Sequence, residues 1–157
     1  MRIIFIDNSI DFTAYSLNLK ALDSLQKILI NFSLELAKKN HEILFYNKIE
    51  KDKKEAGVSW KQIKNLKSDS SDILIAVQDI DLLEYKINAK IKFLLLHYKI
   101  DNQLNKHTLV KMLKQKVCLL YTNNYVVNTL PKNFQYVPKV LLKIGVDKSF
   151  IESRNVS

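Results

Sequence analysis

The apolar positions of residues 24–39 recur with helical spacing and predict one long amphipathic helix. They follow one another at intervals of four, three and four residues: Leu25, Leu29, Phe32 and Leu36. Asp23 precedes the segment as a cap, with Gln26 three residues later, and Lys38 and Lys39 lie in the last turn, where the helix dipole favours cations. The single stripe indicates a helix that packs on a sheet.

Short apolar runs alternate with this and other helical segments. We expect strands at residues 2–6, 43–46, 72–77, 90–96, 117–121 and 135–137. We expect shorter helices at residues 59–66, 81–86, 101–115 and 123–130. Asp101 is the expected cap of the third of these, and Leu113 an inward-facing residue within it. The alternation predicts an α/β fold with a single Rossmann-like, doubly wound parallel sheet.

Length and composition fit one compact domain. The chain has 157 residues and is 47% hydrophobic, which is enough to bury a core. No apolar run approaches the ~20 residues that span a bilayer, so we expect a cytoplasmic protein. Cys118, the single cysteine, cannot form an intramolecular disulfide and is expected to be a buried small hydrophobe.

The net charge of +9 favours anionic partners in principle. Seven lysines crowd one segment: Lys48, Lys51, Lys53, Lys54, Lys61, Lys64 and Lys67. The chain has no arginine-rich stretch and no ribonucleoprotein-type aromatic motif, so we expect a solvated basic surface and no nucleic-acid partner. Trp60 lies among these lysines, and as an interfacial anchor it would give weak contact with an anionic membrane surface.

Phosphate-binding and dinucleotide-binding loops are not expected. Both kinds of loop need closely spaced glycines, and the chain has only Gly57 and Gly145. We therefore expect neither a cofactor nor a metal.

Several stretches, in the right order, resemble the N-terminal domain of retaining GT-B glycosyltransferases, a group that includes bacterial mannosyl- and glucosyltransferases of lipopolysaccharide and capsule synthesis. Residues 34–43, LELAKKNHEI, resemble the family's turn from the first helix into the second strand. Residues 72–77 resemble a strand that begins with Asp, 93–97 the strand that ends in a His, and 117–123 the strand before a short serine-led helix. Residues 144–150, IGVDKSF, resemble the Asn-Gly-Val-Asp…Phe motif that closes that domain.

The sequence departs from the family at four kinds of position. Asp23 and Ser24 stand where the family has a Gly-Gly loop, Asn40 stands at the helix-terminal Gly, and Ile144 replaces the Asn of the closing motif. Asn123 stands near the usual Ser. Asn40 can substitute for Gly at a left-handed helix end at modest cost.

The resemblance implies that residues 1–157 form the acceptor-side half of a hexosyltransferase, without the C-terminal domain that binds the nucleotide sugar. The saccharide or lipid-linked acceptor would belong to bacterial cell-surface polysaccharide or lipopolysaccharide synthesis, at the inner face of the membrane. We expect the chain to be inactive alone. The donor-binding half would be a separate polypeptide that docks to it, a further part of the same protein, or lost, and the sequence does not choose among these. Phe150 and Ile151 are expected to pack on the domain or to join that docking surface.

His97 is the candidate catalytic residue, because it follows a predicted strand at the sheet edge where ligands of open α/β sheets bind, and the resemblance makes it a contact to sugar or acceptor. The candidate substrate-binding residues follow predicted strands or match family positions: Asn8, Ser9, Asp11, Asp23, Ser24, Gln78, Asp79 and Asn123. For Asp23 and Asp79 a plain helix cap remains an alternative, and for His97 a hydrogen-bonded loop residue.

The main alternative is a non-catalytic flavodoxin-like or receiver-like domain that binds a protein partner. Against a receiver, only Asp7 follows the first strand, and no strand-end phospho-acceptor with a lysine partner is apparent. A basic nucleic-acid-binding domain is a third class, which a steep salt dependence of affinity would reveal.

Overall fold

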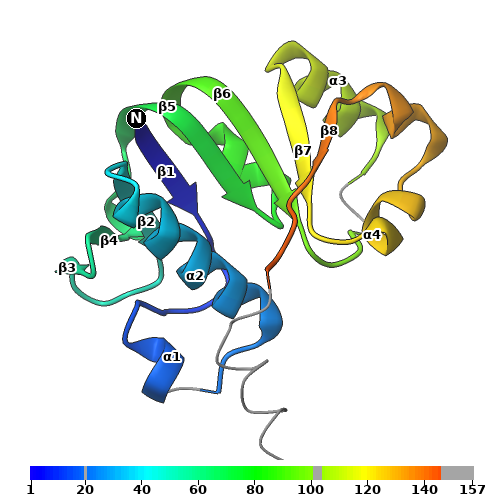
Figure 1. Ribbon diagram of the computed structural model, residues 1–157. Coiled ribbons are helices and arrows are strands. Elements are labelled where there is room, and N and C mark those ends of the chain that lie inside the picture. The colour runs from blue at the N-terminus through cyan, green and yellow to red at the C-terminus, as the bar shows by residue number, and fades with distance from the viewer. Residues whose placement is uncertain (20, 101–103, 146–157) are drawn as a thin grey trace, which may run out of the picture.

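The protein is an α/β domain built on one mostly parallel sheet, as expected. The computed structural model describes residues 1–19, 21–100 and 104–145 (Figure 1). The strands are β1 (Arg2–Ile6), β2 (Glu42–Asn47), β3 (Lys53–Glu55), β4 (Val58–Gln62), β5 (Ser68–Val77), β6 (Lys86–Leu96), β7 (Val117–Tyr121) and β8 (Lys139–Leu141). The α-helices are α1 (Ser16–Leu19), α2 (Ser24–Lys38), α3 (Lys106–Lys114) and α4 (Asn124–Asn128), and the 3-10 helices are η1 (Ile63–Asn65), η2 (Ile80–Glu84) and η3 (Lys132–Tyr136).

The direction of the strand order reverses at β1. The described strands run in the order β3-β4-β2-β1-β5-β6-β7-β8, and β3 alone among them is antiparallel to its neighbour. The chain goes from β1 to β2, then to β3 at the outer edge and back to β4 beside β2, and then returns to the other side of β1 as β5. Such a reversal is the point where open α/β sheets bind ligands, beyond the carboxyl ends of the strands.

Helix α2 forms as the apolar spacing predicts. The Asp23 side chain accepts a hydrogen bond from the backbone N–H of Gln26 at 3.1 Å, so the expected cap is confirmed. Leu25 and Leu29 are buried in the core of one face of the sheet, over which α2 lies (Figure 1). Asn40, with φ of 62°, follows the helix in the left-handed conformation that Asn tolerates.

The prediction of a helix at residues 59–66 is wrong, because this segment forms β4 and then η1. Ala56 and Gly57 both have positive φ (50° and 82°) and make the two-residue turn that joins β3 to β4, a geometry that favours a hairpin. Trp60 is 0% exposed and stacks on Phe45 with ring centroids 5.0 Å apart. The interpretation of Trp60 as a membrane-surface anchor is therefore wrong as well.

Two C-terminal elements differ from the prediction. Residues 132–136 form η3 and the strand lies beyond Pro138, whose carbonyl oxygen accepts a hydrogen bond from Leu119 at 2.8 Å. Helix α3 is capped by Asn105, not Asp101, because Asn105 and Thr108 form a reciprocal capping box. Asp101 lies outside the described residues, as do Asp147, Phe150 and Ile151, and Leu113 is 46% exposed, not inward.

The sheet carries a core on each face, and the two cores differ in how they are covered. Side chains of α3, α4 and the 3-10 helices cover one face. Helix α2 covers the other face over β1, β2 and β4, while over β6 and β8 the side chains of Ile91 (49%) and Val140 (48%) are exposed. Cys118 lies on this second face and is half-buried, so the expectation of full burial is wrong.

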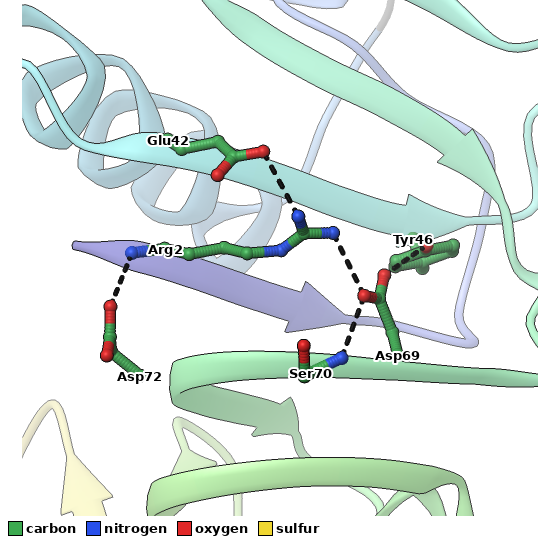
Figure 2. A network of polar contacts seen from close by, with 6 residues as sticks. All are labelled: Arg2, Glu42, Tyr46, Asp69, Ser70 and Asp72. Carbon is green, nitrogen blue, oxygen red and sulfur yellow. Dashed lines mark hydrogen bonds and ion pairs between the residues drawn. The ribbon is translucent and has the colours of Figure 1, made fainter.

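A polar cluster joins β1, β2 and β5 (Figure 2). The Arg2 guanidinium donates to Asp69 at 2.9 Å and to Glu42 at 3.3 Å. The Tyr46 hydroxyl donates to the other Asp69 oxygen at 2.9 Å, and burial together with this hydrogen bond raises the pKa of Tyr46. The backbone N–H of Arg2 donates to Asp72 at 2.8 Å. Asp69 therefore ties side chains of three neighbouring strands together.

We predict that Asp69→Asn lowers the free energy of unfolding by about 1–3 kcal/mol, because Arg2 and Tyr46 lose a charged acceptor in a partly buried site. Glu42→Gln removes the charge of the other, exposed acceptor of Arg2 and should cost no more than about 1 kcal/mol. Urea unfolding of the two variants measures the difference. Equal losses would contradict the role given to Asp69.

Candidate functional site

The backbone of His97 is held by side chains from the two neighbouring strand ends. His97 directly follows β6, and its N–H donates to the Gln78 side-chain oxygen, which follows β5, at 2.9 Å. Its carbonyl oxygen accepts from the Asn123 side-chain nitrogen, beyond β7, at 3.2 Å. The carboxyl ends of these parallel strands therefore meet at His97.

The imidazole of His97 lies between two hydroxyl groups. Nε2 is 2.8 Å from Oγ of Ser24, the first residue of α2, and Nδ1 is 2.6 Å from Oγ1 of Thr122. The ring of Tyr98 packs edge-to-face on the imidazole with centroids 4.6 Å apart. Both ring nitrogens thus have a hydrogen-bond partner, and Ser24 is exposed to solvent.

Partial burial lowers the pKa of His97, and the nearby Asp23 carboxylate opposes this shift. At neutral pH the imidazole is therefore neutral. In that form one ring nitrogen carries a proton and the other is a hydrogen-bond acceptor and a base.

Gln78 and Asn123 position His97, and their polar atoms are largely engaged in doing so. The Gln78 oxygen also accepts from the N–H of Tyr98 at 3.1 Å, and the Gln78 nitrogen donates to the Tyr98 carbonyl at 2.8 Å. Gln78 has φ of 60°, an uncommon conformation for this residue type. The Asn123 oxygen caps α4 by accepting from Val126 at 3.1 Å. The sequence analysis gave both residues as candidates for substrate binding, and the geometry favours a positioning role over direct ligand contact.

Asp23 and Asp79 act as helix caps. The Asp79 carboxylate accepts from the N–H of Asp81 at 2.9 Å at the start of η2. Asp23 caps α2 and is also the charged group near His97. A carboxylate at this helix end disfavours a second anion there.

The loop after β1 approaches α2 but not His97. Asn8 and Asp11 are exposed, and neither contributes to the hydrogen bonds of His97. Ser9 is nearer, because the Gln26 side-chain amide lies between the Ser9 hydroxyl and the Asp23 carboxylate. The structure therefore brings Ser24, Gln78 and Asn123 to His97 and leaves Asn8 and Asp11 apart.

Asp7 and Thr122 belong to this edge of the sheet and were missed by the sequence reasoning. Asp7 is 1% exposed, and its Oδ1 accepts from the N–H of Ser9 at 2.7 Å, while Oδ2 has no hydrogen-bond partner among the described residues. Burial raises the pKa of Asp7. Asp7 and Thr122 each directly follow a predicted strand, as His97 does. Selecting every polar residue directly after a predicted strand would therefore have identified both.

Other parts of the described structure offer fewer side chains that could bind a ligand or take part in a reaction. Among the described residues there is no group of three His, Cys, Asp or Glu side chains that could hold a metal. A groove of ≈ 460 Å³ lies between α2 and residues 142–145, but none of the residues that contact His97 lines it. Within the described ranges, none of the helices combines the length and apolar character that crossing a lipid bilayer requires.

Comparisons with known proteins add no further identification. No family model matches the chain, and no curated protein and no solved structure matches it significantly.

We predict that Asp7→Asn raises the free energy of unfolding at pH 7 on the order of 1 kcal/mol, because it removes a buried, half-satisfied carboxylate. The pKa of Asp7 is raised on folding, so its ionisation destabilises the native state as pH rises above the unfolded value of about 3.9. The gain should therefore disappear near pH 4.

Asp81→Asn, at an exposed position, is the control and should change stability by less than about 0.5 kcal/mol at either pH. Urea titrations at pH 4 and pH 7 provide the measurement. A gain from Asp7→Asn that is the same at both pH values would refute the assignment to ionisation.

A second prediction concerns His97. Its pKa is lowered on folding, so the unfolded chain takes up a proton first as pH falls below about 6.5, and the native state loses stability there. In His97→Gln this part of the pH dependence should be absent, so the wild type should lose more stability than the variant between pH 7.5 and 5. His107→Gln, an exposed control on α3, should follow the wild-type curve.

Proposed function

We propose that the protein is a glycosyltransferase-like domain that binds the hydroxyl groups of a saccharide acceptor at the carboxyl ends of β5, β6 and β7. The observation that carries the proposal is the convergence of hydrogen-bonding side chains on a neutral imidazole at the carboxyl ends of β5, β6 and β7, beside the strand-order reversal between β1 and β5. Ligands of open α/β sheets bind at such a reversal. Uncharged donors and acceptors match the hydroxyl groups of a sugar.

His97 is the catalytic residue in this proposal. Its Nε2 is already within 2.8 Å of a hydroxyl oxygen, that of Ser24, so the imidazole can accept the proton of an acceptor hydroxyl placed there. The hydroxyl oxygen would then attack the anomeric carbon of a nucleotide sugar, and the nucleoside diphosphate would leave. Ser24 would exchange its hydrogen bond to His97 for one to the ligand.

Charge at the site supports a neutral acceptor. Asp23 and Asp7 both lie at this edge, and a carboxylate repels an anion 4 Å away by roughly 4 kcal/mol at an effective dielectric of 20. The nucleotide sugar, which is anionic, would therefore be held by a second, donor-binding domain, in agreement with the family resemblance. We place such an enzyme in bacterial cell-surface polysaccharide or lipopolysaccharide synthesis, at the cytoplasmic face of the membrane.

Nuclear magnetic resonance of ¹⁵N-labelled protein tests the proposal. We predict that neutral hexosides shift the backbone signals of Tyr98, Thr122 and Asn123, and that His97→Ala abolishes these shifts because it removes the central acceptor. His107→Ala is the matched control, since His107 is exposed on α3, and it should leave the shifts unchanged. Charged nucleotide sugars should perturb the same signals less.

Unchanged spectra with a panel of gluco- and manno-configured saccharides would contradict the proposal. They would favour the non-catalytic, partner-binding alternative. Shifts that persist in His97→Ala would place the saccharide elsewhere on the protein.

A further inference from the structure

The contact between Ser24 and His97 has the geometry of a nucleophile and its base. The Ser24 hydroxyl is exposed and lies 2.8 Å from Nε2, within the range for proton transfer. We propose that Ser24 is a nucleophile that accepts an acyl group from an uncharged carboxylic ester and then loses it to water, an esterase activity separate from saccharide transfer.

The base is held in one orientation. Thr122 Oγ1 lies 2.6 Å from Nδ1, and the Asn123 side-chain nitrogen donates to the same oxygen at 3.3 Å. With the imidazole proton on Nδ1 and directed at Thr122, the Nε2 lone pair faces the Ser24 hydroxyl. Thr122 is thus a positioning residue, in the place that a carboxylate occupies in a catalytic triad.

The charge balance around the imidazole suits a base. Partial burial lowers the pKa of His97, so the ring is neutral and able to accept a proton at neutral pH. Once protonated, the imidazolium is stabilised by the carboxylate of Asp23, the nearby charged group that acts on it. A general base must be neutral before the reaction and must be stabilised as a cation after it has taken the proton, and the surroundings of His97 meet both conditions.

Backbone donors are available beside the nucleophile. Ser24 and Leu25 are the first two residues of α2, and their N–H groups have no hydrogen-bond partner among the described residues, since Asp23 caps only Gln26. Free N–H groups in the same helical turn as the nucleophile can stabilise the oxyanion that forms when the hydroxyl attacks a carbonyl. The contact with His97 distinguishes this helix end from an ordinary amino terminus.

The proposed steps balance without a co-reactant other than water. Ser24 Oγ attacks the ester carbonyl carbon while its proton passes to Nε2 of His97. The tetrahedral intermediate breaks its bond to the alkoxide, which takes the proton from Nε2 and leaves as the alcohol. Water then attacks acyl-Ser24 by the same route, releasing the carboxylic acid and restoring Ser24. The nearby Asp23 carboxylate disfavours anionic esters.

A fluorophosphonate probe tests the nucleophile, with labelled sites located by mass spectrometry. We expect Ser24 to react at least about 100-fold faster than Ser70, an exposed serine that makes no hydrogen bond to a histidine among the described residues and serves as an internal reference. His97→Gln should reduce the rate at Ser24 to that of Ser70. Thr122→Val should lower it and alter its pH profile, whereas Ser70→Ala should leave labelling of Ser24 unchanged.

Hydrolysis of p-nitrophenyl acetate tests the second step. The wild type should release more than one equivalent of p-nitrophenolate, above the background given by Ser24→Ala, whose helix start Asp23 still caps. Labelling of Ser24 no faster than Ser70, or unaffected by His97→Gln in a variant with the wild-type circular dichroism spectrum, would overturn the proposal. Turnover equal to that of Ser24→Ala would overturn the hydrolytic step. The hexoside-induced shifts of the wild-type protein, recorded without ester, report the saccharide proposal separately.

Discussion

The structure depends on parallel pairing of β1 with strands on both of its sides. β1 pairs with β2, about forty residues later, and with β5, about seventy residues later. This pairing turns the chain back at β1 and brings the carboxyl ends of β1, β5, β6 and β7 to one edge of the sheet. Asp69 strengthens the arrangement, because its two carboxylate oxygens accept from Arg2 on β1 and Tyr46 on β2.

Two residues at the same edge of the sheet are held in arrangements that lower the stability of the fold. Asp7 is a buried carboxylate with an unpaired oxygen, and Gln78 holds a left-handed backbone conformation. Both cost stability, and groups of this kind concentrate where a protein binds ligands or does chemistry. His97 follows β6, the strand next to the one that ends at Gln78, and is held by hydrogen bonds at its backbone and at both ring nitrogens. The imidazole of His97 lies beside the exposed hydroxyl of Ser24 at this edge of the sheet.

Sequence patterns anticipated most of the secondary structure, and the errors have a common cause. The helix at residues 24–38 and the central strands follow from periodicity, because their burial is set by the sheet. Residues 59–66 were assigned to a helix because Trp60, Ile63 and Leu66 also fit a helical spacing, whereas residues 58–62 form β4. The two-residue turn at Ala56 and Gly57 instead pairs this segment with β3 and β2, a tertiary contact that a local pattern does not contain.

The sequence by itself determined the alternation of strands and helices, the cap at Asp23, and the polar residues that follow the strands. Only the tertiary structure decided which of these residues meet. Ser24 and His97 are separated by 73 positions, and Thr122 and His97 by 25, so no spacing rule connects them. Their contact arises because backbone pairing and burial over the whole domain set the strand order of a parallel sheet. The sequence of one segment specifies only how long that helix or strand is and which of its faces is apolar.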